Sequence, residues 1–302
     1  MKNKSLVSIN DYTKDEIIRI LDFAESFERQ PRQDILKDKV IASLFFEPST
    51  RTRLSFESAA QQLGASVIGF SSAATSSVQK GETLKDTILT VSNYSDLIVM
   101  RHSVDGSARY ASEVSPVPII NAGDGANQHP TQCLLDLYSI RKTQGTLDNL
   151  DIMFVGDLKY GRTVHSLTMA LCHFNTRFHL VSPVELKLPS AVKQHIKNAK
   201  LQYEQYTDMA EVVPAADILY MTRIQRERFP DPIEYEKVKN SYNLTLCMLD
   251  AAKPNLKVLH PLPRVNEINT DVDSSPMAYY FQQALNGVYV RQALMAAILG
   301  RV

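Results

Sequence analysis

Hydrophobic residues along the chain form short continuous runs, and segments with helical spacing of apolar positions lie between them. The runs are VIASLFF (40–46), SVIGF (66–70), DLIVMRH (96–102), VPIINAG (117–123), DIMFVGD (151–157), TRFHLV (176–181), DILYMT (217–222) and LKVLHP (256–261). Helical spacing is clearest at 83–94, 131–145 and 162–174. Runs that are apolar throughout, separated by helices, are typical of parallel strands in a sheet covered on both faces. The pattern therefore predicts an α/β fold with doubly wound parallel sheets.

The strand-like runs fall into two groups, which a polar stretch at 142–150 (KTQGTLDNL) separates. A chain of 302 residues is also longer than one typical domain. We expect a first domain at 1–145 and a second at 146–286. The last run has a helical pattern, and we expect a helix from about residue 287 to 302 to pack back on the first domain.

The charge balance limits the kind of partner that the chain can have. Lys and Arg total 33, Asp and Glu total 33, and 44% of residues are hydrophobic. A neutral chain argues against general binding to nucleic acid or to an acidic membrane surface. Neither a signal peptide nor an apolar stretch of about 18 residues is evident. The sequence predicts a cytoplasmic protein in which any strongly basic site is local.

The three cysteines, Cys133, Cys172 and Cys247, are far apart and form no Cys-x-x-Cys pair. This spacing suggests neither a disulfide framework nor a zinc site. Each cysteine lies in an apolar segment, so we expect buried, unreactive thiols.

The segment 45–64 (FFEPSTRTRLSFESAAQQLG) passes from a strand into a helix and carries two arginines at the helix start. The positive end of the helix dipole disfavours a cation there by roughly 0.3 to 1 kcal/mol. Ser49 or Thr50 could be an ordinary cap, with Arg51 and Arg53 pointing into water. Alternatively, backbone N–H groups, hydroxyls and a guanidinium hold an anion at this helix end, and we favour a phosphate.

Polar and cationic residues follow successive predicted strands. Ligands of open α/β sheets bind outside the carboxyl ends of the strands, so these positions are candidates for a site. They are Ser49, Thr50, Arg51, Thr52, Arg53, Lys80, Arg101, His129, Gln132, Arg162, Arg223, Gln225, Leu262, Pro263 and Arg264. The recurrence of cations in a neutral chain predicts a site for small substrates with several negative charges.

Each of these residues also has an ordinary structural interpretation. Lys80 could simply precede a helix capped by Thr83, and His129 could be a helix-entry residue before a proline. Arg162 and Arg223 could lie on the surface. Only their joint recurrence favours a site.

Two other functional classes are open at this point. Residues 156–163 (GDLKYGRT) fit the phosphate-loop pattern G-x-x-x-x-G-K-[ST] except that arginine replaces lysine, and Asp250 could imitate a metal-binding acid of a nucleotide hydrolase. That alternative is weak because arginine does not replace this lysine and because residues 49–53, Arg101 and His129 are left without a role. A non-catalytic binding protein on the same scaffold would be expected to lack some of these polar groups.

The ordered motifs EPSTRTRLSFE, KGETLKDT, MRH, NAGDGANQHPTQ, GDLKYGRTVHSL, MTRIQRERF and HPLPRVNEI resemble those of aspartate carbamoyltransferase catalytic chains. The resemblance extends from about Ser8 to the C-terminus. Ser-x-Arg-Thr-Arg and His-Pro-x-Gln alone would specify only a carbamoyltransferase. KGET, TRIQ and HPLPR favour aspartate, because the ornithine enzymes typically carry HCLP in place of HPLP.

The resemblance implies direct transfer of a carbamoyl group from carbamoyl phosphate to the amine of L-aspartate, in de novo pyrimidine biosynthesis, with no cofactor, metal or covalent intermediate. It implies that Arg51, Thr52, Lys80, Arg101 and His129 are catalytic. Thr52, Arg101 and His129 would polarise the carbamoyl carbonyl. The residues implied to bind carbamoyl phosphate are Ser49, Thr50, Arg51, Thr52, Ser76, Lys80, Arg101, His129 and Gln132.

The resemblance also implies the second substrate site and the assembly. The residues implied to bind aspartate are Lys80, Arg162, Arg223, Gln225, Leu262 and Pro263, the last two through backbone carbonyls beside a cis Leu262–Pro263 bond. A homotrimer with shared active sites is implied, in which Ser76 and Lys80 come from the neighbouring chain. Zinc-binding regulatory chains, found with some relatives, are a possible further partner.

Overall fold

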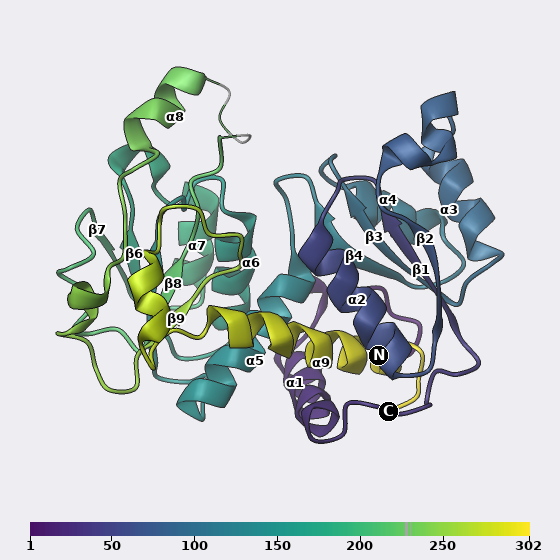
Figure 1. Ribbon diagram of the computed structural model, residues 1–302, viewed down its shortest axis with the longest axis horizontal. Coiled ribbons are helices and arrows are strands. Elements are labelled where there is room, and N and C mark those ends of the chain that lie inside the picture. The colour runs from purple at the N-terminus through teal and green to yellow at the C-terminus, as the bar shows by residue number, and fades with distance from the viewer. Residues whose placement is uncertain (227–228, 230) are drawn as a thin grey trace. The chain divides into compact units, whose positions relative to one another are not determined.

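The computed structural model describes residues 1–226, 229 and 231–302 (Figure 1). Of the motif MTRIQRERF, Glu227 and Arg228 lie outside the described residues. The strands form a four-stranded and a five-stranded sheet, and every ladder between named strands is parallel. The predicted α/β fold with two parallel sheets is confirmed.

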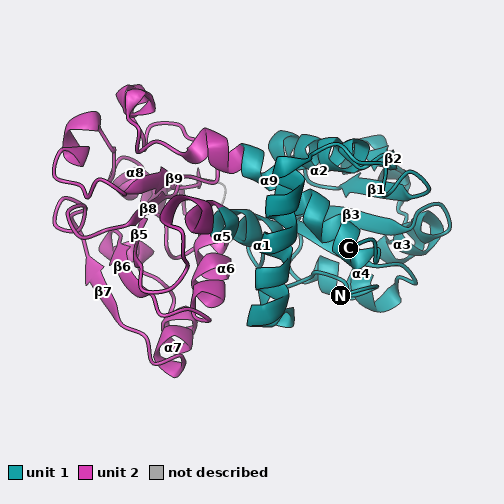
Figure 2. Cartoon of the chain, turned by 90° about the horizontal axis from the view of Figure 1, so that it is seen from below, with its two compact units in different colours: residues 1–138, 285–302 teal, residues 139–284 magenta. Residues whose placement is uncertain are grey.

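The chain divides into two compact units, coloured separately in Figure 2. Unit 1 contains residues 1–138 and 285–302, and unit 2 contains residues 139–284. The chain leaves unit 1 within helix α5 (Pro130–Gln144) and returns within helix α9 (Tyr280–Ile298). Unit 1 is therefore built from both ends of the chain.

The last turns of α9 pack against the N-terminal part of unit 1. Arg291 Nη1 donates to Ser55 Oγ at 2.9 Å, and Gln292 Nε2 donates to the Pro31 carbonyl at 2.6 Å. The Arg291 side chain is buried over the Phe56 ring, 4.9 Å from its centroid. The predicted return of the C-terminal helix to the first domain is confirmed, although the helix ends at Ile298.

The sheet of unit 1 has the strand order β2-β1-β3-β4. Its strands are β1 (Val40–Phe45), β2 (Ser66–Phe70), β3 (Leu97–His102) and β4 (Ile119–Asp124). The other helices of this unit are α1 (Lys14–Arg29), α2 (Thr50–Gln62), α3 (Leu84–Ser92) and α4 (Ser107–Val114), with 3-10 turns at Ile9–Asp11, Ala73–Thr75 and Ser77–Lys80. All four strands match runs predicted from the sequence.

Both faces of this sheet are buried along most of β1, β3 and β4, whereas the residues of the edge strand β2 are exposed or half-buried. Side chains alternate along a strand, and Ala42, Leu44, Ile98 and Met100 pack in one apolar cluster with Ile88 of α3 and two alanines of α4. The intervening residues of β1, at 41, 43 and 45, are buried as well. This double burial explains why β1 is apolar throughout rather than alternating.

The sheet of unit 2 has the strand order β7-β6-β5-β8-β9. Its strands are β5 (Asp151–Val155), β6 (Arg177–Val181), β7 (Tyr203–Tyr206), β8 (Ile218–Met221) and β9 (Lys257–Leu259). Its helices are α6 (Arg162–Leu171), α7 (Ser190–Asn198) and α8 (Pro232–Val238), with 3-10 turns at Val184–Leu186, Leu246–Leu249 and Thr270–Ser274. The pattern of the sequence did not predict β7.

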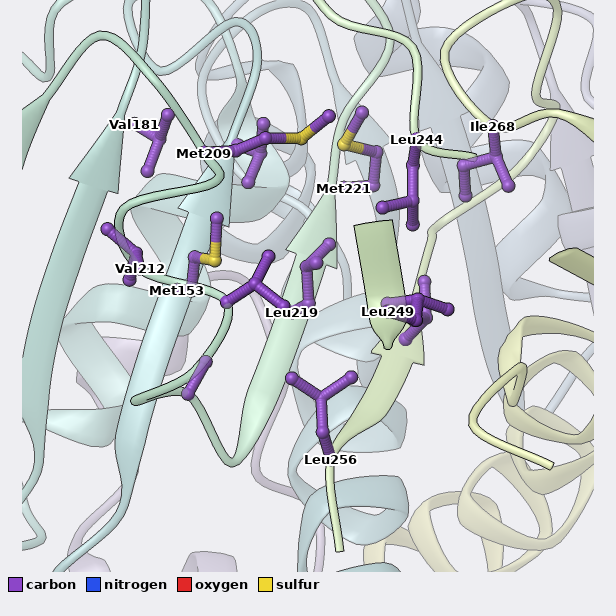
Figure 3. Packing of buried hydrophobic residues seen from close by; sticks show 14 of the residues in the cluster. Met153, Val181, Met209, Val212, Leu219, Met221, Leu244, Leu249, Leu256 and Ile268 are labelled. Atoms are coloured by element: carbon purple, nitrogen blue, oxygen red, sulfur yellow. The ribbon is translucent and has the colours of Figure 1, made fainter. Parts of the chain in front are cut away.

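Figure 3 shows the apolar cluster on one face of the second sheet. Met153, Leu219 and Met221 project from the central strands toward Met209 and Leu244. On the other face, the aromatic rings of neighbouring strands meet: the Phe154 centroid lies 6.3 Å from Phe178 and 5.6 Å from Tyr220. The middle of this sheet is thus also covered on both sides.

The cysteines differ in part from the prediction. Cys133 is buried, but Cys172 is only partly buried and Cys247 is exposed. Cys247 lies in the 3-10 turn Leu246–Leu249, where Leu249 is the residue buried in the core. The expectation of three buried thiols is therefore wrong for Cys247, because a 3-10 turn points its side chains in different directions.

Candidate active site

The carboxyl ends of the unit 1 strands carry the residues predicted to bind the first substrate. Because all strands are parallel, these ends lie along one edge of the sheet. The register pairs Phe45 at the end of β1 with Arg101 on β3, and Phe46 N–H donates to the Arg101 carbonyl at 2.9 Å. The helix that follows β1 therefore starts beside Arg101.

The N-terminus of α2 has the features expected of an anion site. Ser49 is the N-cap residue, with an extended backbone and no capping hydrogen bond from its side chain. Arg53 Nε donates to Glu57 Oε1 at 2.8 Å, so its charge is compensated one turn later. Arg51 is exposed and Thr52 is buried. Of the two arginines placed against the helix dipole, Arg51 is thus the more exposed one.

Arg101 is held in place by protein groups. Its Nη2 lies 2.7 Å from Glu47 Oε2, and its side chain is only 12% exposed. The pair with Glu47 keeps the guanidinium at the strand ends and leaves its charge largely compensated. A bound phosphate would compete with Glu47 for this arginine.

The loop after β4 is organised by Asp124, which the sequence reasoning missed. One Asp124 oxygen accepts from Asn121 Nδ2 at 2.8 Å and from Gln128 N–H at 3.2 Å, and the other accepts from Gly106 N–H at 2.9 Å. Asp124 is buried, so these contacts fix the turn that leads to His129. A carboxylate directly after a buried strand was the available signal.

His129 and Gln132 lie at the start of α5 and are both buried. Gln132 Nε2 donates to Asp136 Oδ1 at 2.8 Å. An ionised carboxylate only accepts hydrogen bonds, so this contact turns the amide nitrogen of Gln132 toward Asp136 and leaves its Oε1 for another donor. An acceptor in this position suits a substrate that carries an NH₂ group.

Ser76 and Lys80 follow β2, in the Ser-rich stretch between that strand and α3. Ser76 caps the turn Ser77–Lys80, and Lys80 is its last residue. The Lys80 side chain is exposed. Thr83 caps α3 through Asp86 N–H, as the ordinary structural interpretation required.

The predicted residues of unit 2 lie at three adjacent strand ends. In the order β5-β8-β9, Arg162 follows the first strand, Arg223 and Gln225 the second, and Leu262 with Pro263 the third. Arg162 is the first residue of α6 and is 9% exposed. The edge of this sheet therefore gathers the predicted aspartate ligands.

The loop after β5 does not have the form of a nucleotide phosphate loop. Asp157 Oδ1 accepts from Lys159 N–H at 3.1 Å and from Tyr160 N–H at 2.9 Å, so a side chain uses amides that a phosphate would need. Gly156 has a φ of +114°, and a Cβ there would lie 2.4 Å from the Thr222 carbonyl oxygen. Asp250 ends a 3-10 turn rather than a strand. Neither the loop at 156–163 nor Asp250 therefore has the structure that the nucleotide hydrolase alternative requires.

The loop after β9 contains the cis peptide bond Leu262–Pro263 that the resemblance implied. Arg264, the last residue of HPLPR, makes a two-pronged pair with Asp273 at 2.5 Å and donates to Tyr280 Oη at 3.0 Å. The hydrogen bonds that Arg264 donates to Asp273 raise the pKa of Arg264. Its side chain therefore anchors the loop within unit 2.

Comparisons with known proteins agree with this arrangement. Residues 4–142 match the family domain described as "Aspartate/ornithine carbamoyltransferase, carbamoyl-P binding domain", and residues 148–298 match "Aspartate/ornithine carbamoyltransferase, Asp/Orn binding domain". The chain belongs to the aspartate/ornithine carbamoyltransferase family. Among members of this family, the aspartate carbamoyltransferase catalytic subunits of Phocaeicola vulgatus and Bacteroides fragilis are each 62% identical to it over 301 residues. Each alignment covers 99% of this chain. The first covers 96% of the Phocaeicola vulgatus protein, and the second covers 98% of the Bacteroides fragilis protein.

Solved structures of this carbamoyltransferase family have the same fold. The catalytic subunit of M. jannaschii aspartate transcarbamoylase superposes with a TM-score of 0.92 at 49% identity, covering 98% of each chain. Aspartate transcarbamoylase from Trypanosoma cruzi, in complex with carbamoyl phosphate and aspartate, superposes with a TM-score of 0.94 at 36% identity, covering 99% of this chain and 97% of that one.

In the part of the chain that the structure describes, no group of three or more His, Cys, Asp or Glu side chains is placed to hold a metal ion. None of the helices there combines the length and apolar character that a bilayer crossing demands.

Proposed function

We propose that this chain transfers the carbamoyl group of carbamoyl phosphate to the amine of L-aspartate, giving N-carbamoyl-L-aspartate and phosphate in de novo pyrimidine biosynthesis. The observation that carries the proposal is the set of cationic and hydrogen-bonding residues at the carboxyl edges of both sheets, in a chain of the carbamoyltransferase family. Relatives crystallised with both substrates support it.

The phosphate group is held at the start of α2 by Ser49, Thr50, Arg51 and Thr52, with Arg101 beside them. The phosphate gains negative charge as its bond to the carbamoyl carbon breaks. Donors that are already oriented act most strongly on such developing charge, and losing one typically costs about 10² to 10³ in turnover. The Ser49 hydroxyl, which makes no capping hydrogen bond, and the largely buried side chain of Arg101 support this assignment.

The carbamoyl group is polarised by Thr52, Arg101 and His129. Gln132 accepts from the carbamoyl NH₂, which fits the orientation that Asp136 gives its amide. We assign His129 as a hydrogen-bond donor to the carbonyl oxygen rather than as the general base. Residues 1–145, together with the C-terminal helix, form the domain for this substrate.

Aspartate is bound by residues 146–286. Arg162, Arg223 and Gln225 hold its two carboxylates with the help of Lys80, and the backbone carbonyls of Leu262 and Pro263 contact substrate nitrogen. The amine nitrogen attacks the carbamoyl carbon, the carbon–oxygen bond to phosphate breaks, and the amine proton passes to the leaving phosphate. No covalent enzyme intermediate is needed.

Two anionic substrates repel each other in water, and the cationic site removes this obstacle. Holding the amine against the carbonyl converts a reaction between two molecules into one within a complex, which can lower the barrier by about 7 to 11 kcal/mol. Binding of carbamoyl phosphate before aspartate follows from this division of the site.

A homotrimer with shared active sites is the assembly that we propose. Lys80 and Ser76 come from the neighbouring chain, which suits the exposed position of the Lys80 side chain. Zinc-binding regulatory chains remain a possible further partner. The cytoplasm is the proposed compartment, and the presence of all three cysteines as thiols is in keeping with it.

The direct test supplies carbamoyl phosphate with either L-aspartate or L-ornithine, without ATP or added metal. We expect carbamoylated aspartate and phosphate in equal amounts and no carbamoylated ornithine. Carbamoylation of ornithine alone would refute the proposal and indicate an ornithine carbamoyltransferase instead. Hydrolysis of ATP with magnesium and no carbamoyl transfer would revive the nucleotide hydrolase alternative.

A further inference from the structure

The loop from His260 to Glu267 is held together by a buried histidine–glutamate pair. His260 is 2% exposed and Glu267 is 5% exposed. His260 Nε2 lies 2.7 Å from Glu267 Oε1. His260 directly follows the last residue of β9, so the pair sits at the base of the loop that carries Leu262 and Pro263.

The second ring nitrogen of His260 determines which form the ring takes. Leu262 N–H lies 2.7 Å from His260 Nδ1 and can only donate. Nδ1 is therefore the acceptor, and the ring proton is on Nε2, which donates to Glu267. Burial lowers the pKa of His260, with a smaller opposing effect from Glu267 and a further lowering from the charges of Arg264 and Arg223, in keeping with a neutral ring.

Glu267 holds the far side of the same loop. Its Oε2 accepts from Val265 N–H at 3.0 Å and from Asn266 N–H at 3.1 Å. The backbone N–H of His260 in turn donates to Gln283 Oε1 at 2.8 Å. The His260–Glu267 pair thus accepts hydrogen bonds from three backbone N–H groups of the loop. The backbone of His260 is itself hydrogen-bonded to α9.

We propose that His260 and Glu267 are positioning residues for carbamoyl transfer. The contact with Nδ1 fixes the peptide plane before Leu262, and the contacts with Glu267 fix the N–H groups of Val265 and Asn266, so the short segment that carries both carbonyls is held at both ends. The inference rests on the proposed function, in which the carbonyls of Leu262 and Pro263 contact substrate nitrogen. Neither side chain touches the reacting atoms.

A plain structural role would have a different signature. A buried histidine that only satisfies polar groups contributes to stability, and its loss reduces the amount of folded enzyme without changing the rate of each folded molecule. A positioning residue changes that rate, since a misplacement of about 1 Å can cost about 10²-fold. The two roles are separated by variants that keep one ring contact at a time.

Two substitutions of His260 each keep one of the two hydrogen bonds that its ring makes. In His260→Asn the amide oxygen takes the place of Nδ1 and can accept from Leu262 N–H, but the side chain is too short to reach Glu267. In His260→Gln the amide nitrogen takes the place of Nε2 and can donate to Glu267, but Leu262 N–H loses its acceptor. His195 of α7 is exposed, so His195→Asn and His195→Gln are matched controls.

The assay measures kcat per folded molecule and the KM for each of the two substrates. The folded fraction is taken from urea unfolding, followed by circular dichroism. We expect His260→Asn to keep kcat within about 10-fold of the unsubstituted enzyme and His260→Gln to lose about 10²-fold. The KM for carbamoyl phosphate should change less than twofold, and the His195 variants should match the unsubstituted enzyme. Equal kcat for the two His260 variants, or a higher kcat for His260→Gln, would overturn the inference.

A second variant decides the question if His260→Gln does not fold. Glu267→Gln keeps the side-chain volume and an acceptor for His260, but it turns an NH₂ group toward Val265 and Asn266 N–H. We expect kcat to fall about 10-fold in the folded enzyme, and an unchanged kcat would refute the positioning role. The unsubstituted enzyme is assayed first, so a failure of the proposed function appears there as no carbamoylaspartate.

Discussion

Asp151→Asn should destabilise unit 2 by an amount that depends on pH. Asp151 begins β5, and its carboxylate lies 2.8 Å from Arg177 Nε, 3.0 Å from His179 Nε2 and 3.7 Å from Lys253 Nζ. The hydrogen bond from Arg177 is the largest cause that lowers the pKa of Asp151 from 3.8 to about 2, against an opposing effect of burial. The Asp151 side chain is 10% exposed, but the Arg177 side chain is 55% exposed, so solvent partly screens their contact.

The size of the effect follows from the two pKa values. The difference between 3.8 and about 2 corresponds to an upper bound of about 2.5 kcal/mol of stability from Asp151 at pH 7, because solvent screens the exposed Arg177. Because the folded-state pKa is the lower one, this stabilisation is complete above pH 3.8 and is lost as the pH falls toward 2. Near pH 3, at most about 1.3 kcal/mol should remain. The asparagine variant should therefore unfold at most about 5 to 10 °C lower at neutral pH, at about 2 to 4 °C per kcal/mol.

The assay is urea unfolding at pH 7 and near pH 3, with sucrose present at both to keep the chain folded. Circular dichroism is the suitable signal, because the chain has no tryptophan. The control is Asp250→Asn, since Asp250 is exposed in the same unit. An equal loss of stability at both pH values, or a loss below about 1 kcal/mol at pH 7, would refute the linkage of Asp151 to its cationic neighbours.

The remaining predictions concern the proposed active site. Arg51→Ala should lower kcat by about 10² to 10³ with the fold intact. Arg53→Ala should have a much smaller effect, because the Arg53 side chain pairs with Glu57. Similar rates for the two variants would contradict the assignment of Arg51. Arg223→Ala should raise the KM for aspartate about 10- to 100-fold, and a change in the KM for carbamoyl phosphate instead would contradict the division of substrates. Chains with Ser49→Ala and chains with Lys80→Ala should be inactive separately and regain activity when mixed into one trimer; no recovery in verified mixed trimers would count against shared sites.

The sequence predicted most of the fold because the central strands of each sheet are buried on both faces. Runs such as 40–46 and 151–157 are apolar throughout for that reason, and their positions were found to within a few residues. Strand β7 was missed because it lies at the sheet edge, where the exposed Glu204 and Gln205 interrupt the apolar pattern. The pairing of an edge strand depends on its one neighbour, and no local signal in the sequence shows it.

For the candidate site, the sequence indicated which residues we expect to contact substrate. Residues just past the strand ends could be found from spacing alone, because parallel strands align these ends. Asp124, Asp136 and the pair His260–Glu267 could not, since what they contact depends on how loops and helices close in space. Arg264 illustrates the converse: its position after β9 indicated a substrate cation, but Asp273 and Tyr280 occupy it.

The discontinuous make-up of unit 1 bears on how the protein is made. During synthesis, residues 139–284 are complete before residues 285–302, so unit 2 can fold first while unit 1 still lacks the part of α9 that packs beside Ser55 and Pro31. A nascent chain stalled before residue 285 would then expose the unfinished apolar surface of unit 1 to chaperones, and α2 would gain its support only at the end of translation.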